Sequence, residues 1–246
     1  MRQSERLWHL ARSYGMGEWF MAAWVEGLET WEVARRLGVS VADVDDAVGC
    51  DWGDLLEGMS FDGGPGVIWA SRLNENWTQI IQVRGHDCDG SLRDLSYGGR
   101  ALLVWWDLNG PRDLKYAVNG VHATGFSVTT PGERWGRHPA ALDSYAHGLR
   151  FDLADSSWES DPDLTPGWLE YAAWEEARME SGRDYGEEDE ILPSGWDDFI
   201  ALAHNGYSPR LATCVTSALT LVGRVTGREF DREWMNGTHT RYLLPE

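Results

Sequence analysis

The chain has 246 residues, of which 42% are apolar and 15 are tryptophan, which is enough for a single domain with a sizeable core. Its 40 acidic residues outnumber the 21 basic ones, so the formal net charge is -19. A chain this acidic is not expected to bind nucleic acid directly or to adhere to an anionic membrane, because both surfaces attract basic proteins. The charge instead favours a basic partner.

Residue usage also predicts a location. Cys50, Cys88 and Cys214 are far apart and form no CxxC pair, so no disulfide framework is expected and a reducing cytoplasm is predicted. Only one basic residue, Lys115, is a lysine, which is typical of a GC-rich bacterial genome. No apolar run reaches the roughly 18 residues of a membrane span, and the first residues lack the apolar core of a signal peptide.

The N-terminal residues are expected to be helical. Residues 3–27 fit one helix with a single break at Gly15 and Gly17. Its second half carries apolar residues at helical spacing, namely Phe20, Ala23, Trp24 and Leu28.

Residues 30–48 have the outline of a helix-turn-helix, in which Thr30 caps the first helix, Gly38 lies in the turn and Ser40 caps the second helix. One hypothesis is DNA binding, and the alternative is a helical hairpin used only for packing. Phosphate would repel the carboxylates of the second helix, so the packing hairpin is favoured. Those carboxylates are Asp43, Asp45 and Asp46.

The centre of the chain is expected to form an antiparallel sheet. Asn119-Gly120 is the strongest short hairpin signal, because both central residues of a type I′ turn need positive φ. Residues 101–108 are apolar on both faces, which predicts a central, covered strand. The sequence therefore predicts a meander of about five strands, over residues 67–73, 77–84, 101–108, 114–118 and 121–128.

The second half of the chain changes character. Residues 151–200 contain 16 acidic residues and two arginines, a net charge of −14. Further helices are expected over residues 140–148, 167–180, 196–203, 208–226 and 231–235. The predicted fold class is α+β. One domain spans residues 1–246, its antiparallel meander is covered by N-terminal and C-terminal helices, and residues 151–207 form an acidic helical insert.

Several stretches together resemble an uncharacterised actinobacterial family, a domain of unknown function. They read GLETWEVARRLGV, ENWTQIIQV, ALLVWWDLNGPRDLKYAVNGVHATGFSV, RHPAALD and ALTLVGRVTGREF, and cover about residues 17–150 and 208–246. The shared features are Leu37-Gly38, Asn119-Gly120 and Val225-Thr226-Gly227. The resemblance implies a fold and transfers no catalytic residue.

Two clusters carry residue types that catalyse reactions or bind metals. Residues 85–90, GHDCDG, offer His, Cys and carboxylates, but four adjacent residues cannot all reach one ion, so a simple turn is favoured over a metal site. His138, Asp143 and His147 could orient a general base, but no nucleophile stands at a strained elbow near them. We predict no metal and no cofactor, since neither GxxxxGKS/T nor GxGxxG occurs.

Two functions follow as hypotheses, and whether the protein is an enzyme is left open. The first is a non-enzymatic binding or immunity-type protein that captures a basic protein or peptide. Its surface would comprise Trp158, Trp168, Tyr171, Trp174, Glu175, Glu176, Glu187, Glu188, Asp189 and Glu190. The alternative is an enzyme or small-molecule binder with a Trp-lined pocket against the sheet, formed by Trp69, Trp77, His86, Trp105, Trp106 and His122.

Overall fold

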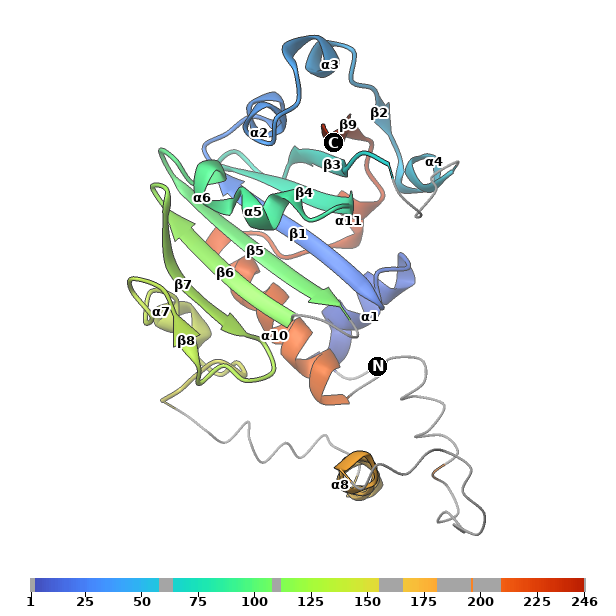
Figure 1. The fold of residues 1–246 in the computed structure, drawn as a ribbon, viewed down its shortest axis with the longest axis vertical. Helices are drawn as coiled ribbons and strands as arrows, with labels where there is room; N and C mark the ends of the chain where they lie inside the picture. The colour runs from blue at the N-terminus through green and yellow to red at the C-terminus, as the bar shows by residue number, and fades with distance from the viewer. Residues whose placement is uncertain are drawn as a thin grey trace.

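The computed structural model describes residues 3–57, 64–107, 112–154, 166–180, 196 and 209–245. Among these residues the strands form a nine-stranded antiparallel sheet in the order β2-β9-β3-β4-β1-β5-β6-β7-β8 (Figure 1). The α+β class is therefore confirmed, with a wider sheet than the five strands predicted. The strands are β1 (Trp19–Glu26), β2 (Gly49–Cys50), β3 (Val67–Arg72), β4 (Trp77–Arg84), β5 (Arg100–Asp107), β6 (Arg112–Val118), β7 (Val121–Ser127), β8 (Arg134–Trp135) and β9 (His239–Leu243).

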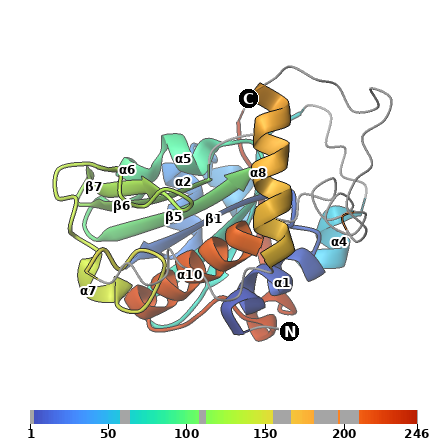
Figure 2. The same cartoon turned by 90° about the horizontal axis from the view of Figure 1, so that it is seen from below.

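Two helices cover one face of the sheet. The helices α1 (Arg6–Ser13) and α10 (Pro209–Thr226) pack against each other and against this face (Figure 2). Trp106 of β5 lies at the centre of this core, stacked on Phe20 at 4.0 Å and tilted against Trp8 at 5.6 Å. The predicted apolar stripe of the last helix is buried here, through Leu211, Val215, Ala218, Leu219, Val222 and Val225.

Three shorter helices cover part of the opposite face, namely α2 (Thr30–Arg36), α5 (Asp87–Gly90) and α6 (Leu92–Leu95) (Figures 1 and 2). Met21, Ala23 and Val25 of β1 point into this second core, together with Leu103 of β5. Since β5 has apolar side chains in both cores, its predicted place in the middle of the sheet is confirmed.

The largest correction concerns residues 19–26, which were expected to be helical and instead form β1. This strand separates β4 from β5, so Ala23 pairs with Ile80 on one side and with Leu103 on the other. Phe20 and Trp24 enter one core while Ala23 enters the other, so their helical spacing was fortuitous. A strand buried on both faces shows no alternation, and periodicity cannot then separate it from a buried helix.

The ends of the sheet bring further corrections. The tail was expected to be only a short helix, but α11 (Arg232–Met235) is followed by β9, which pairs with β3. The helix expected over 140–148 is reduced to α7 (Asp143–Ala146). The described part also contains η1 (Gln3–Glu5), α3 (Val41–Asp45), α4 (Trp52–Leu56) and α8 (Pro166–Glu180).

The predicted local signals for turns and caps are largely present. Asn119 and Gly120 both have positive φ, 48° and 78°, as a type I′ turn requires. Ser40 accepts a hydrogen bond from the backbone N–H of Asp43, so it caps α3 as expected. By contrast, Thr30 is the first helical residue of α2, and its predicted capping position is held by Glu29.

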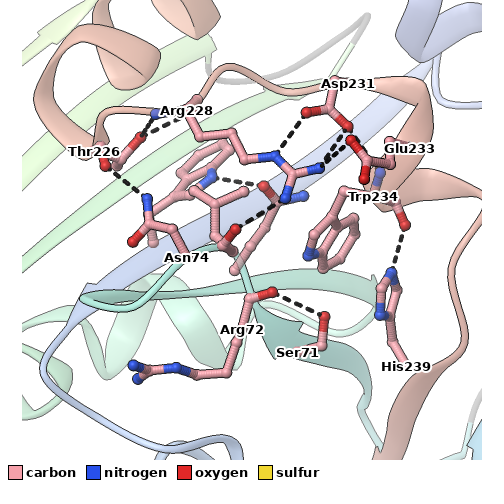
Figure 3. Close-up of polar contacts among 12 residues, drawn as sticks. Ser71, Arg72, Asn74, Thr226, Arg228, Asp231, Glu233, Trp234 and His239 are labelled. Carbon is pink, nitrogen blue, oxygen red and sulfur yellow. Dashed lines mark hydrogen bonds and ion pairs between the residues drawn. The ribbon is translucent and has the colours of Figure 1, made fainter.

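A polar network joins the end of α10 to the β3–β4 turn (Figure 3). The Arg228 guanidinium contacts both carboxylate oxygens of Asp231, at 2.8 and 3.1 Å, and donates to the carbonyl of Leu73 at 3.0 Å. Asn74 donates to the carbonyl of Thr226 at 2.9 Å. Burial raises the pKa of Asp231, but hydrogen bonds from Arg228 and the Trp234 N–H outweigh it, so the pKa lies below its ordinary value. These contacts fix the C-terminal segment that leads into β9.

Candidate functional site

A groove of about 690 Å³ lies between α3 and the C-terminal end of β9. Carboxylates and a backbone turn form one wall, and the last described residues form the other. The lining residues are Gly38, Val39, Ser40, Asp43, Asp46, Ala47, Val48, Cys50, Arg241, Tyr242, Leu243, Leu244 and Pro245. Its volume falls in the range of about 300–1,000 Å³ that is typical of ligand sites.

One wall of this groove is a free strand edge. On the inner side of β9, Tyr242 pairs with Ile68, and the Leu244 N–H donates to Gly66. On the outer side the Arg241 N–H donates to the carbonyl of Val48, and the β2–β9 ladder begins at Thr240. Because backbone groups alternate in direction along a strand, the amide of Leu243 also points outward, where the described residues provide no strand partner.

The other wall is acidic. Asp43, Asp45 and Asp46 are exposed on and just after α3, and no ion pair joins them to a basic side chain in the described part of the chain. Asp43 accepts a hydrogen bond from the Ser40 hydroxyl at 2.6 Å. A cationic side chain entering the groove therefore meets uncompensated negative charge.

Apolar side chains stand exposed around the same groove. Val41, Val48 and Leu243 are 61%, 71% and 47% exposed, and Trp31 of the neighbouring α2 is 48% exposed. Large apolar side chains grouped beside a strand edge mark an interaction surface more often than a solvated one.

The opposite edge of the sheet is closed. The strand β8 covers β7 at Gly125 and Phe126. The chain then continues along the same edge, where the N–H groups of Arg137 and His138 donate to His122 and Ala123. The outermost strands are β2 and β8, but β2 pairs only with His239 and Thr240, so the end of β9 beyond β2 leaves backbone groups open for a further strand.

A second hollow, of about 490 Å³, lies where β1 begins and β4 ends. We call it the aromatic cleft. It is lined by Tyr14, Gly15, Met16, Glu18, Trp19, Phe20, Met21, Trp52, Leu56, Ile81, Gln82, Val83, Arg84, Gly85 and His86. Two ring pairs in it are perpendicular: Tyr14 with Trp52 at 6.4 Å and 90°, and Trp19 with His86 at 6.2 Å and 88°.

The six residues predicted to line a Trp pocket do not meet at one cavity. Trp69, Trp77 and Trp106 are buried in the core beneath α1 and α10. His86 lines the aromatic cleft, and its ring lies 5.2 Å from Trp105. His122 lies on β7. The aromatic walls come instead from Trp19 and Trp52, the first of which was expected within a helix.

His122 and Trp105 border a charged cluster. Lys115 Nζ lies 2.7 Å from Asp89 Oδ1 and 3.7 Å from Asp113 Oδ2, and 5.8 Å from the centre of the Trp105 ring. Burial raises the pKa of Asp113, and the Asp89 charge adds to this effect against that of Lys115. Burial lowers the pKa of His122, and the charges of Lys115 and Arg93 reinforce the shift. The Lys115–Asp89 ion pair ties α5 to β6.

The acidic partner surface predicted over residues 151–200 is described only in part. Trp158, Glu187, Glu188, Asp189 and Glu190 lie outside the described residues, and Trp168 lies on α8. Tyr171 is buried and Trp174 half-buried, and both rings pack near Trp196, at 5.6 and 5.5 Å. Glu175 pairs with Arg178 at 2.8 Å, and Glu176 is exposed. The aromatic residues described here pack on one another.

The other candidate clusters are engaged in local contacts. Residues 87–90 form α5, with Cys88 buried and Asp87 accepting from Gln82 at 2.6 Å. Asp143 pairs with Arg134, and His147 lies 3.1 Å from Asp152. Among the described residues no group of three His, Cys, Asp or Glu side chains is placed to hold a metal ion, and no helix has the length and apolar character to cross a membrane.

Comparison with protein-family models, with curated proteins and with solved structures finds no match for this chain. The resemblance to an actinobacterial family stays a prediction.

Proposed function

We propose that the protein binds an extended, basic segment of a partner protein or peptide, which adds a strand to the outer edge of β9. The observation that carries this proposal is the groove beside Leu243, where an open strand edge faces exposed carboxylates. Main-chain hydrogen bonds to a free edge supply affinity in such complexes, and alternate side chains supply specificity.

The walls of the groove set the chemistry of the segment. In an added strand, successive side chains point to opposite faces of the sheet. Basic side chains on one face would reach Asp43 and Asp46, and apolar side chains would contact Val48 and Leu243. A segment that alternates basic and apolar residues satisfies both walls. The net charge of −19 adds long-range attraction for the same partner.

The first experiment measures fluorescence anisotropy with a labelled peptide of about eight residues that alternates Lys and Val, a length within the usual range of strands. A Glu–Val peptide of the same length is the charge control. A Lys–Val peptide with alternate backbone amides N-methylated keeps the charge and loses the edge hydrogen bonds. We expect binding of the first peptide only, weakening as salt is raised.

Matched variants locate the site. Asp43→Lys with Asp46→Lys should weaken binding of the Lys–Val peptide by roughly tenfold, since each reversed charge contributes up to about 1 kcal/mol at an exposed pair. Glu133→Lys, an exposed change near the closed β8 edge, is the control and should leave affinity nearly unchanged. Equal binding of the N-methylated peptide, or equal losses in both variants, would show nonspecific attraction and overturn the proposal.

A further inference from the structure

The aromatic cleft lies apart from the groove beside β9 and shares no lining residue with it. We infer that the cleft binds an organic cation of the quaternary ammonium type. Its aromatic walls, the charge at its rim and its size favour this class of ligand.

Aromatic side chains in the walls favour a cationic ligand. Tyr14, Trp19, Trp52 and His86 line the cleft, and they pack edge to face in two pairs, Tyr14 with Trp52 and Trp19 with His86. Proteins usually bind quaternary ammonium groups against aromatic rings, because the face of a ring attracts a cation.

The positions of these rings are fixed by the fold. The Trp52 indole N–H donates to the carbonyl of Tyr14 at 3.1 Å, and its ring packs on buried Trp69 at 5.3 Å. The Tyr14 hydroxyl donates to Asn236 at 2.6 Å. Since these contacts hold the walls before any ligand arrives, little side-chain freedom is lost on binding.

The charge at the rim agrees with a cationic ligand. Glu18 lines the cleft, is exposed, and has no ion-pair partner among the residues that the structure describes. Arg84 also lines the cleft, but its Nε donates to the Pro65 carbonyl at 2.7 Å and its guanidinium lies against Gly64. The arginine charge is thus held at the 64–65 loop, and the overall charge of the chain raises the local concentration of cations.

The size of the cleft indicates that the ligand is larger than its ammonium head group. A volume of about 490 Å³ is larger than a trimethylammonium head group needs. Met16, Met21 and Ile81 line the remainder, and methionine adapts to irregular apolar shapes. The ligand class is therefore a quaternary ammonium head group that carries further organic substituents.

The test uses choline and its uncharged carbon isostere, 3,3-dimethyl-1-butanol, titrated into the full chain by isothermal calorimetry at matched ionic strength. We expect choline to bind in the millimolar range and the isostere at least about fivefold more weakly, since the two differ in charge alone. Equal affinity would show a merely apolar cavity. No binding of choline up to about 50 mM would also overturn the inference.

Variants place the binding in the cleft. Trp19→Leu should weaken choline binding by at least about fivefold, and Glu18→Gln, an exposed change that leaves the core intact, by about twofold to fivefold. Trp135→Leu removes an exposed indole at the far edge of the sheet and should change nothing. If Trp19→Leu and Glu18→Gln both bind choline as the parent does, the site is elsewhere. Peptide binding at β9 is measured separately, so either proposal can fail alone.

Discussion

Replacing Arg228 by methionine tests how the C-terminal segment is held against the sheet (Figure 3). Methionine keeps most of the side-chain volume and removes the charge. The change breaks the paired contacts with Asp231, at 2.8 and 3.1 Å, and the hydrogen bond to the Leu73 carbonyl at 3.0 Å. A weaker contact with Glu233, at 3.4 Å, is lost as well.

The expected loss of stability depends on how exposed the two charged side chains are. Arg228 and Asp231 are 30% and 35% exposed, so solvent screens their ion pair and it contributes about 0.5–1 kcal/mol. The hydrogen bond from a charged donor to Leu73 contributes about 1–1.5 kcal/mol. We therefore expect Arg228→Met to lower the free energy of unfolding by about 2 kcal/mol.

Asp231→Asn separates the two contributions. In the parent protein the Trp234 N–H donates an N-capping hydrogen bond of 2.7 Å to Asp231 Oδ1. Asparagine can still accept this bond, so the substitution removes only the charge. Its expected cost is about 0.5–1 kcal/mol. The double variant should then cost less than the sum of the two single changes, by about the energy of the ion pair.

The assay is urea unfolding, followed by tryptophan fluorescence and by far-UV circular dichroism, with unfolding energies compared at equal m-values. Coincident transitions by the two probes are required, because they show that a two-state treatment holds. The reasoning is refuted if Arg228→Met costs no more than Asp231→Asn, since the contact with Leu73 then contributes nothing. If the double variant costs as much as the sum of the two single changes, Arg228 and Asp231 do not form a stabilising ion pair.

Two further predictions concern a turn and a titrating group. Gly120→Ala should lower the free energy of unfolding by about 1–2 kcal/mol in urea, because Gly120 has a φ of 78° and an added Cβ would lie 2.4 Å from the Tyr97 ring. Gly90→Ala is the control, since an added Cβ there meets no heavy atom within 4 Å. Equal losses in the two variants would contradict this explanation. Burial lowers the pKa of His239, so the native state favours the neutral imidazole. The neutral side chain therefore contributes fully to the stability of the protein above about pH 6.5, and this contribution is lost as the pH falls through the native pKa. When the free energy of unfolding in urea is measured at each pH, His239→Gln should lose less of it than the parent protein between about pH 7 and 5. Parallel plots of unfolding free energy against pH would show that His239 does not contribute.

The correct sequence predictions share one property, which is that neighbouring residues decide them. The Asn119-Gly120 turn depends on two residues that tolerate positive φ. The hydroxyl of Ser40 reaches an amide three residues on, and Gly38, with a φ of 92°, ends the preceding helix. The long α10 begins at Pro209 and ends before Gly227, and these local signals define it although nearly all of its described side chains are buried.

The errors arose where distant contacts override local pattern. The β1 strand is buried by helices on both faces, so its sequence lacks the alternation that marks a half-exposed strand. The β9 strand does not alternate either, since the polar His239, Thr240 and Arg241 are followed by the apolar Tyr242 and Leu243, so its sequence carries no period-2 signal. Its pairing with β3, about 170 residues away along the chain, could not be read from either segment.

The candidate sites show the same division. Negative charge, abundant tryptophan and the local turns follow from the sequence alone, because they depend on composition and on adjacent residues. The packing of distant segments instead sets which indoles are core and which line a cleft: Trp69 and Trp106 are enclosed, while Trp19 and Trp52 line one hollow from separate elements. It also places the end of β9, beyond the short β2, beside the carboxylates of α3, because strand order and register depend on long-range pairing.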